Sequence, residues 1–233
     1  MGKLKKAILN IHYLFLLFLL LSVTKVVGQA ETEEVRINGA ILKVMANSTA
    51  IASGSVTALN NYNSGTVEVD ASGVMTAEGP VDNESSSSFQ VDGQLNVKGN
   101  WVNNATASVA LAGATQGTVT FLGTSPQTIG GGVSTLFEGL TISNATGVAL
   151  GQNQTVSNQL TFTAGILSTG ANRLDVTAAA DGVSGFGTGK YIFGNFRRYL
   201  PSTLTDYDLP IGTATQYEYS AIRIMSQTGQ KRG

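Results

Sequence analysis

Between Gly99 and Asn172 the sequence repeats short apolar runs, among them Thr118-Val119-Thr120-Phe121, Leu140-Thr141-Ile142, Val148-Ala149-Leu150 and Leu160-Thr161-Phe162. Several residues of like character recur at one interval: Ile142 and Leu160, Val148 and Ile166, and Val156 and Leu174 are each eighteen residues apart. A period near 20 that contains several β-forming runs is typical of stacked coils. The pattern therefore predicts an all-β fold, a β-solenoid whose coils bury their inward residues against one another.

The repeat begins before Gly99. Gly79 and Gly99, Val81 and Trp101, and Asn83 and Asn103 are each twenty residues apart, and Leu42-Lys43-Val44 is a weaker copy of Val67-Glu68-Val69 and of Phe89-Gln90-Val91. We therefore expect the solenoid to occupy residues 35–180. Residues 181–233 are more aromatic and charged, and their alternation predicts antiparallel strands. This element would cap the solenoid or form an incomplete β-sandwich, as in a truncated product of a longer protein.

Charge is nearly absent from the regular coils. Glu138 is the only charged residue between Gly99 and Asn172. In a stack of coils, equivalent positions lie about 4.8 Å apart, so that like charges repel while Thr, Ser and Asn side chains hydrogen-bond along the stack. Gly and Asn tolerate the backbone conformations of sharp corners. We accordingly predict turns at Asn103-Asn104 and at Gly130-Gly131-Gly132.

The N-terminus has the pattern of a signal peptide. Lys3, Lys5 and Lys6 precede an apolar segment, Ile8 to Val23, and Val26-Val27-Gly28 supplies a cleavage site before Gln29. The apolar segment is short and ends in small residues, which favours a cleaved signal at residues 1–28 over an uncleaved anchor. The sequence thus predicts a secreted or cell-surface protein with no membrane span after signal removal. Residues 29–34 are expected to be a flexible lead-in.

Composition excludes several functions. Removing residues 1–28 removes four of the fourteen basic residues and none of the fifteen acidic ones, so the mature chain has a net charge of −5. Such a chain lacks a basic patch for nucleic acid. His12, the only histidine, lies in the signal, and the chain has no Cys. Ser-His-Asp and Cys-His catalysis, His-ligated zinc and thiolate metal sites are therefore excluded, and we expect no cofactor, metal or catalytic site.

Two lines of sequence carry a family resemblance. They are Gly117-Thr118-Val119-Thr120-Phe121-Leu122-Gly123 with Gln127-Thr128-Ile129-Gly130, and Phe137-Glu138-Gly139-Leu140-Thr141-Ile142-Ser143-Asn144. Together they resemble the β-helical repeat region of large secreted surface proteins of the Bacteroidetes group. The resemblance implies a right-handed parallel β-helix in an adhesin-like protein that is cargo of type IX secretion. Family members usually end in a sorting domain, which this sequence lacks, and the family offers no catalytic motif.

The candidate ligand contacts each have a structural alternative. Trp101, with Asn103 and Asn104 nearby, could form a sugar-stacking platform, although an inward Trp that fills the coil is the more common arrangement. Asp206 and Asp208 flank Tyr207 and could serve glycoside chemistry or bind calcium, or could form a solvated turn. Tyr199 and Tyr207 could belong to an aromatic binding surface or to a cap, together with Tyr191, Tyr217 and Tyr219.

Other polar residues are weaker candidates. Asp70 and Asp92 occupy matching repeat positions and could form a calcium ladder or Asx turns. Arg197 and Arg198 could meet an anionic polysaccharide or lie on a solvated strand face. Glycosylation sequons occur at Asn47, Asn83, Asn104, Asn144 and Asn153, and these also arise by chance in a chain rich in Asn, Thr and Ser.

Two function hypotheses follow. The first is a non-enzymatic, exported structural or adhesive module that binds polysaccharide or another surface protein through uncharged Thr, Ser and Asn faces. The second is a β-helical polysaccharide lyase or hydrolase that uses carboxylates. The scarcity of ionisable groups in the regular coils favours the first hypothesis.

Overall fold

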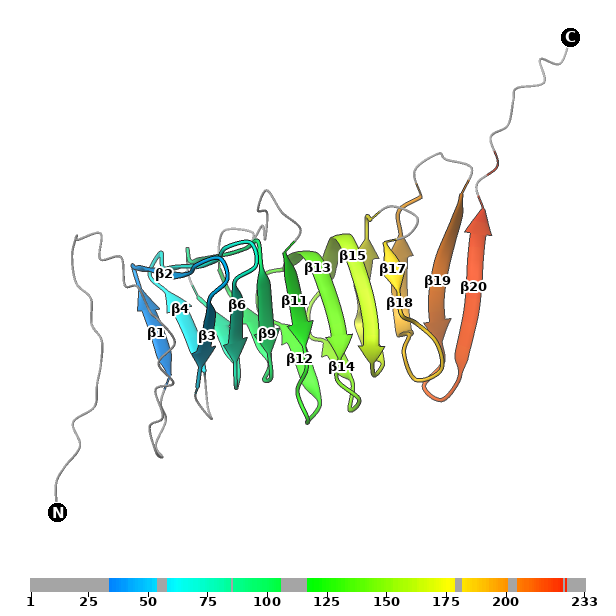
Figure 1. Ribbon diagram of the computed structural model, residues 1–233. Helices are drawn as coiled ribbons and strands as arrows, with labels where there is room; N and C mark the ends of the chain where they lie inside the picture. Colours follow the sequence, from blue (N-terminus) through cyan, green and yellow to red (C-terminus); the bar gives the residue numbers. More distant parts are fainter. Residues whose placement is uncertain are drawn as a thin grey trace, which may run out of the picture.

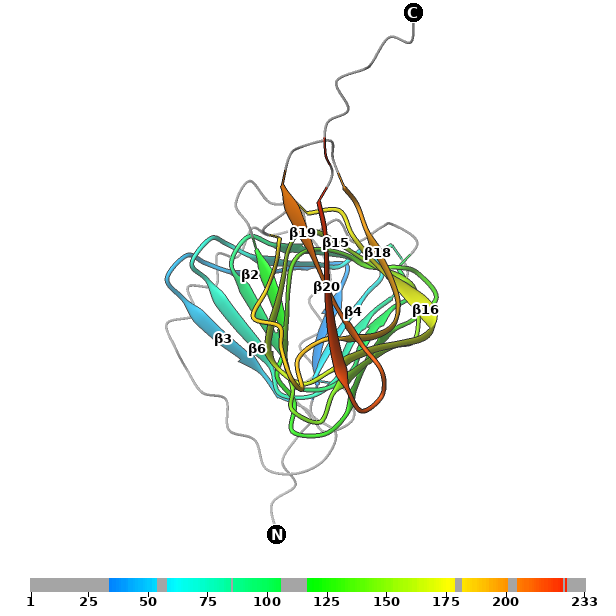
Figure 2. The same ribbon diagram turned by 90° about the vertical axis from the view of Figure 1, so that its right-hand side faces the viewer.

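The strands of this protein follow the alternation of its sequence. The computed structural model describes residues 34–53, 58–84, 86–105, 117–178, 182–200, 205–223 and 225. Within these residues the chain contains strands and no helix, and it winds into a parallel β-solenoid of about seven turns. Figure 1 shows the coils side by side along one axis, and Figure 2 shows the closed outline of the coil from the end. The predicted all-β solenoid is therefore confirmed.

Each coil contributes strands to three walls. Within one coil the chain passes first through the wall that we call face A, then through face C and last through face B. Parallel pairs link neighbouring strands of face A from the first coil to the last. These strands are β1 (Val35–Asn38), β4 (Leu59–Tyr62), β7 (Val81–Asn83), β10 (Trp101–Asn103), β12 (Gln127–Gly130), β14 (Val148–Leu150) and the first residues of β16 (Leu167–Val176) and β18 (Ile192–Arg198).

The other two walls are built in the same way. Face C begins with β2 (Ile41–Val44), β5 (Thr66–Val69) and β8 (Ser88–Val91). Face B holds β3 (Thr49–Ala52), β6 (Val74–Ala77), β9 (Gln94–Val97), β11 (Thr118–Phe121) and β17 (Val183–Ser184). In later coils, β13 (Leu136–Ser143) and β15 (Gln154–Ala164) each run from face C into face B, and the second half of β16 continues face C.

The core is the space enclosed by the three walls. Inward residues of successive coils lie in register, as where Leu59 pairs with Val81 and Val81 with Trp101. Aromatic rings continue this stack through the middle coils, since the Trp101 ring centroid lies 5.0 Å from that of Phe89 and 6.2 Å from that of Phe137. The apolar core is thus a line of side chains along the axis, and every coil depends on its neighbours to bury it.

The coil length differs from the interval of eighteen read from the sequence. Leu140 pairs with Leu160 and Ile142 with Phe162, so these coils are twenty residues long. The predicted period near 20 is thus confirmed. The interval of eighteen between like residues does not mark paired positions, because side chains alternate with a period of two and a shift of two residues still sets apolar against apolar. By contrast, the interval of twenty from Val81 to Trp101 and from Asn83 to Asn103 is confirmed.

The C-terminal end combines parallel and antiparallel pairing. β19 (Asp206–Gly212) and β20 (Tyr217–Arg223) form the predicted antiparallel element, and they close one end of the rod in Figure 1. β18, however, pairs in parallel with β16, and its Ile192 pairs in parallel with Ile211 of β19. Parallel stacking therefore runs past residue 180. The sequence assigned β18 to the antiparallel element because residues 181–233 are more aromatic and charged. In the structure the polar residues of β18 lie on its outer side, while Ile192 remains buried.

Candidate functional site

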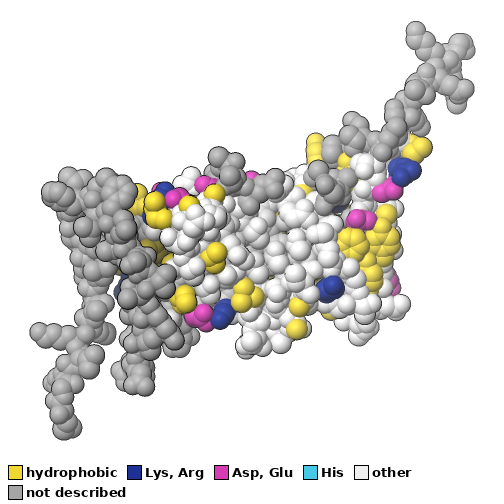
Figure 3. All heavy atoms as spheres, viewed as in Figure 1, with side chains coloured by type: hydrophobic (Ala, Val, Ile, Leu, Met, Phe, Trp, Pro, Cys, Tyr) yellow, Lys and Arg dark blue, Asp and Glu magenta, His cyan; other side chains and the backbone are white. Residues whose placement is uncertain are grey.

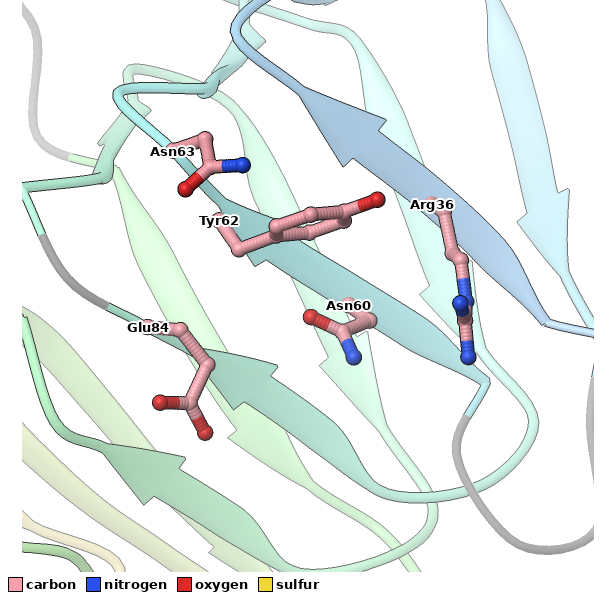
Figure 4. A pocket seen from close by; sticks show the side chains of 5 residues that line it. All are labelled: Arg36, Asn60, Tyr62, Asn63 and Glu84. Atoms are coloured by element: carbon pink, nitrogen blue, oxygen red, sulfur yellow. The ribbon is translucent and has the colours of Figure 1, made fainter. Parts of the chain in front are cut away.

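A shallow depression opens on face A near the N-terminal end of the rod. It has a volume of about 370 Å³ and is lined by Arg36 of β1, by Asn60, Tyr62 and Asn63 in and after β4, and by Glu84 after β7. In Figure 4 the Tyr62 phenol points across the depression towards Arg36, with Asn60 below the ring and Glu84 on the opposite side. An aromatic ring surrounded by amide, carboxylate and guanidinium groups is suited to a polar ligand with an apolar side.

The local sequence explains why these side chains face outward. In Leu59-Asn60-Asn61-Tyr62 of β4, Leu59 and Asn61 are fully buried, so Asn60 and Tyr62 project to the outside. Parallel register then places Arg36 beside Asn60, and it places Tyr62 one position beyond the pair of Asn61 with Asn83. The depression is therefore assembled from three coils: the first and third contribute one residue each and the second contributes three.

Some polar groups of the depression already have partners within the protein. Arg36 forms an ion pair with Glu34. Asn63 donates to the side chain of Asn38 (2.9 Å), and Glu84 accepts a hydrogen bond from Asn104 (3.3 Å). The Asn60 Oδ1 atom is buried and has no hydrogen-bond partner among the described residues. A buried acceptor without a donor costs free energy, and this atom is shielded from the solvent side of the depression.

A row of buried amides lies on the inner side of the same strands. Asn61 Nδ2 donates to Asn83 Oδ1 (3.1 Å), and Asn83 Nδ2 donates to Asn103 Oδ1 (3.0 Å). The row ends at Thr135, whose hydroxyl accepts from Asn103 Nδ2 (3.3 Å) and from Trp101 Nε1 (3.0 Å). We call Asn61, Asn83 and Asn103 the asparagine ladder. It holds β4, β7 and β10 in one register, so that the outer residues sit on a rigid wall.

Trp101 and Asn103 are core residues in this structure. Both have no exposed surface, and both hydrogen-bond to Thr135 inside the coil. Neither side chain presents a face to a ligand, which agrees with the alternative of an inward Trp. The prediction of a turn at Asn103-Asn104 is confirmed in part: Asn103 ends strand β10, and its Oδ1 accepts a hydrogen bond from the Ala105 backbone N–H (3.3 Å), as in an Asx turn. At the predicted glycine turn, Gly131 has a φ of +115° and a Cβ there would overlap the Asn103 backbone.

A cluster of aromatic residues, from buried to exposed, lies at the C-terminal end. The rings of Phe186 and Tyr219 stack with centroids 5.8 Å apart, and Tyr217 lies 5.7 Å from Tyr191. Figure 3 shows an apolar area at this end of the rod, with acidic side chains beside it and mostly uncharged coils in the middle. Burial, with a smaller effect from the Asp208 charge, raises the pKa of Tyr217, and a hydrogen bond to Asp208 raises the pKa of Tyr219.

The carboxylates predicted near this cluster are engaged by neighbouring strands. Asp206 forms two hydrogen bonds with Arg223 (2.6 and 2.7 Å), and Asp208 accepts from the Tyr219 hydroxyl (2.6 Å). Both lie on one side of β19, as alternation predicted, and within the strand instead of in a turn. Tyr207 is fully buried beneath Arg198, whereas Tyr199 is 62% exposed. The structure thus places Tyr207 on the inner side of β19 and the carboxylates of Asp206 and Asp208 on its outer side.

The remaining predicted polar residues also form ion pairs or turns. The register of β5 with β8 confirms that Asp70 and Asp92 occupy matching positions, and Asp70 forms an ion pair with Lys43 (2.8 Å). Arg197 forms one with Asp175 (2.6 Å), which also binds Arg173. No group of three or more His, Cys, Asp or Glu that could hold a metal occurs in the described part of the chain. Nor does that part contain a helix long and apolar enough to cross a membrane.

The depression on face A was missed by sequence reasoning. The available signal was Asn60 and Tyr62 at outward positions of a strand whose neighbours carry Arg36 and Glu84. These four residues can be recognised as neighbours only once the strand register is known. The register could not be read from a constant repeat, because the coils here have unequal lengths: paired residues are twenty-four apart from Val35 to Leu59 and twenty-two apart from Leu59 to Val81.

Comparison with known proteins does not assign the chain to a family. No family model matches the chain, and neither a curated protein nor a solved structure matches it. The resemblance of roughly residues 91–224 to bacterial surface proteins therefore rests on sequence alone, and the fold rests on the strand register described above.

Proposed function

We propose that this protein is a non-enzymatic, exported module of a bacterial cell surface that binds polysaccharide along the outside of its solenoid. The depression on face A carries the proposal, because it places an aromatic ring among amide and charged groups on a rigid wall. Pairs of uncharged side chains also occur on the other two walls: the Thr66 and Ser88 hydroxyls lie 3.2 Å apart on face C, and those of Thr161 and Ser184 lie 3.3 Å apart on face B. Such hydroxyl pairs suit a ligand that is itself rich in hydroxyls.

An enzyme of the lyase or hydrolase type is the competing proposal. It requires two carboxylates held about 5–10 Å apart across a substrate and available for proton transfer or attack. Many of the described carboxylates are instead engaged by cations or a phenol: Lys98 binds Glu78, Lys43 binds Glu68, and Tyr219 binds Asp208. We therefore favour binding without cleavage.

Export is the second part of the proposal. It is supported by the basic start, apolar segment and small-residue site of residues 1–28, and the resemblance to secreted surface proteins agrees with it. N-terminal sequencing of protein recovered from the culture medium or the cell envelope tests this part. We expect the mature chain to begin at Gln29. An N-terminus that retains Met1 in a cytoplasmic fraction would contradict export.

Binding and cleavage can be tested in one sample. The protein is incubated with insoluble cellulose, xylan, mannan and chitin, and the supernatants are analysed for loss of protein and for released oligosaccharides. Soluble polygalacturonate is tested separately for released oligosaccharides. The proposal expects depletion of the protein by at least one polysaccharide without release of products. Reproducible release of products would establish the enzyme, and binding to none of the polysaccharides would overturn the proposed ligand class.

A further inference from the structure

The depression on face A spans three consecutive coils. Outward positions of neighbouring coils lie about 4.8 Å apart, so the first and third coils are separated by roughly 10 Å along the axis. With a volume of about 370 Å³, the depression has room for one or two sugar rings. It is open along the wall, which permits a longer chain to continue beyond it.

Its hydrogen-bonding groups are mixed. The Arg36 guanidinium donates only, the Glu84 carboxylate accepts only, and the carboxamide of Asn60 can do both. The Asn60 Oδ1 atom itself is buried, so the groups of the depression that face a ligand are chiefly the Arg36 guanidinium and the Glu84 carboxylate. A sugar hydroxyl donates and accepts at once, so a polyol can satisfy both residues together.

Tyr62 supplies the apolar part of the depression. Its side chain is half-buried and crosses the wall between Arg36 and Glu84. A pyranose ring has one face of C–H groups, which packs on an aromatic ring, and an edge of hydroxyls, which requires polar partners. The combination of one aromatic ring with flanking amides and ions matches that division.

The charge around the depression selects against an acidic ligand. Arg36 is already paired with Glu34, Glu84 lies on the opposite side, and Asp82 occupies the register position next to Asn60. The carboxylates thus outnumber the guanidinium. A uronate or sulfated sugar would meet a negative potential, whereas a neutral sugar would not.

We propose that the depression formed by Arg36, Asn60, Tyr62, Asn63 and Glu84 is a subsite for a neutral glycan, with Tyr62 as the stacking residue. This inference rests on the proposed function and names its ligand class and its location. The glycan lies across β1, β4 and β7, so that successive coils contact successive parts of it.

Isothermal titration calorimetry on the full chain tests the subsite. The probes are cellohexaose, xylohexaose, mannohexaose and chitohexaose, with hexagalacturonate as the acidic comparison. The variants are Tyr62→Ala, Tyr62→Phe and Glu84→Gln, and Tyr199→Ala is the matched control, because Tyr199 is an exposed tyrosine far from face A of the first coils. Circular dichroism and urea midpoints confirm that each variant is folded.

We expect the wild type to bind at least one neutral hexasaccharide and to bind hexagalacturonate more weakly. Tyr62→Ala should weaken binding about tenfold, Glu84→Gln should weaken it by a smaller factor, and Tyr62→Phe and Tyr199→Ala should retain it. If Tyr62→Ala fails to fold, Glu84→Gln decides.

Three results would overturn the inference. Neutral-sugar binding that Tyr62→Ala and Glu84→Gln leave unchanged would remove the subsite but leave the proposed function standing. Tighter binding of hexagalacturonate would remove the neutral ligand class. Failure of the wild type to bind any probe would overturn the subsite and the proposed polysaccharide binding together.

Discussion

The asparagine ladder shows how single residues fix the register of the coils. A buried carboxamide costs free energy unless its donors and acceptors are paired, and pairing along the axis is possible only when Asn occupies the same position in successive coils. Asn83 meets this condition on both sides, since it accepts from Asn61 and donates to Asn103. A slip of one residue would bury an unpaired amide in each coil, so the ladder disfavours other registers.

Asn83→Ala should destabilise the protein by about 2 kcal/mol, because it removes two buried hydrogen bonds and leaves a small cavity. Asn61 and Asn103 each keep another partner, Ser88 O and the Ala105 amide, which limits the loss. The matched control is Gln90→Ala, an exposed position of the next strand, which should change stability by less than about 0.5 kcal/mol. Urea unfolding measures both variants, and equal midpoints would contradict the role of the ladder.

Trp101 offers a direct test of which residues are core. It is the only tryptophan in the chain and has no exposed surface. Its fluorescence should therefore be blue-shifted relative to free tryptophan and resistant to quenching by iodide, and it should not change when a hexasaccharide binds on face A. Emission like that of a solvated indole, or quenching by added glycan, would instead support the sugar-stacking role considered from the sequence.

At the scale of elements, glycine sets where a coil can turn. Gly165 lies between β15 and β16 with a φ of +87°, and a Cβ there would overlap the Asn144 carbonyl oxygen of the neighbouring coil. Gly170 has a φ of +56° and open space around its Cα. Both glycines have a left-handed backbone conformation, but only Gly165 lies against the backbone of the adjacent coil.

Gly165→Ala should therefore be far more damaging than Gly170→Ala. The change at Gly170 costs the left-handed conformation alone, about 1–2 kcal/mol, while the change at Gly165 adds an overlap with backbone that can be relieved only by separating two coils. Thermal unfolding of both variants provides the comparison. Similar losses of stability would show that the coils do not approach each other as closely as described.

The antiparallel hairpin at the C-terminus carries a pH-dependent contact. The Tyr219 hydroxyl donates to Asp208, and this hydrogen bond raises the pKa of Tyr219 above its usual value near 10. Since the folded pKa is the higher one, the contact stabilises the hairpin at neutral pH and is lost as pH rises through that pKa.

Spectrophotometric titration of tyrosinate should thus show one or more tyrosines ionising late in the wild type. Asp208→Ala should move that ionisation to lower pH, because it removes both the acceptor and its charge. Arg223→Ala, which affects the neighbouring ion pair with Asp206, serves as the control and should leave the Tyr219 ionisation late. An unchanged titration in Asp208→Ala would contradict the contact.

The elements differ in how far the sequence predicts them. Alternation and the interval of twenty correctly paired Val81 with Trp101, because both strands are short and bounded by clear turns. β18 was misassigned because alternation does not distinguish parallel from antiparallel pairing; that choice depends on where the chain returns, which is set by the coil below it. Sequence alternation likewise does not distinguish the buried Tyr207 from the exposed Tyr199; the strand register is needed to tell them apart.

For the whole molecule, the sequence predicts the rod but not the ligand surface. The rod follows from the alternation of apolar and polar residues, which is repeated in every coil. Misplacing a single residue therefore does not change the predicted fold. The depression on face A depends on the register of three coils with unequal lengths, and a shift of β4 by one residue would turn Asn60 and Tyr62 inward. A site of that kind can be found only after the coils are placed.

The central claim is that a neutral glycan binds to face A across β1, β4 and β7. An NMR titration of isotopically labelled full-length protein with the tightest-binding neutral hexasaccharide tests it most directly, because each backbone amide reports on its own surroundings. We predict shifts that saturate with ligand and cluster at Arg36, Asn60, Tyr62 and Glu84, with none on face B or in the β19–β20 hairpin. Shifts confined to the hairpin or to face B, or no shifts at high hexasaccharide concentration, would contradict the claim.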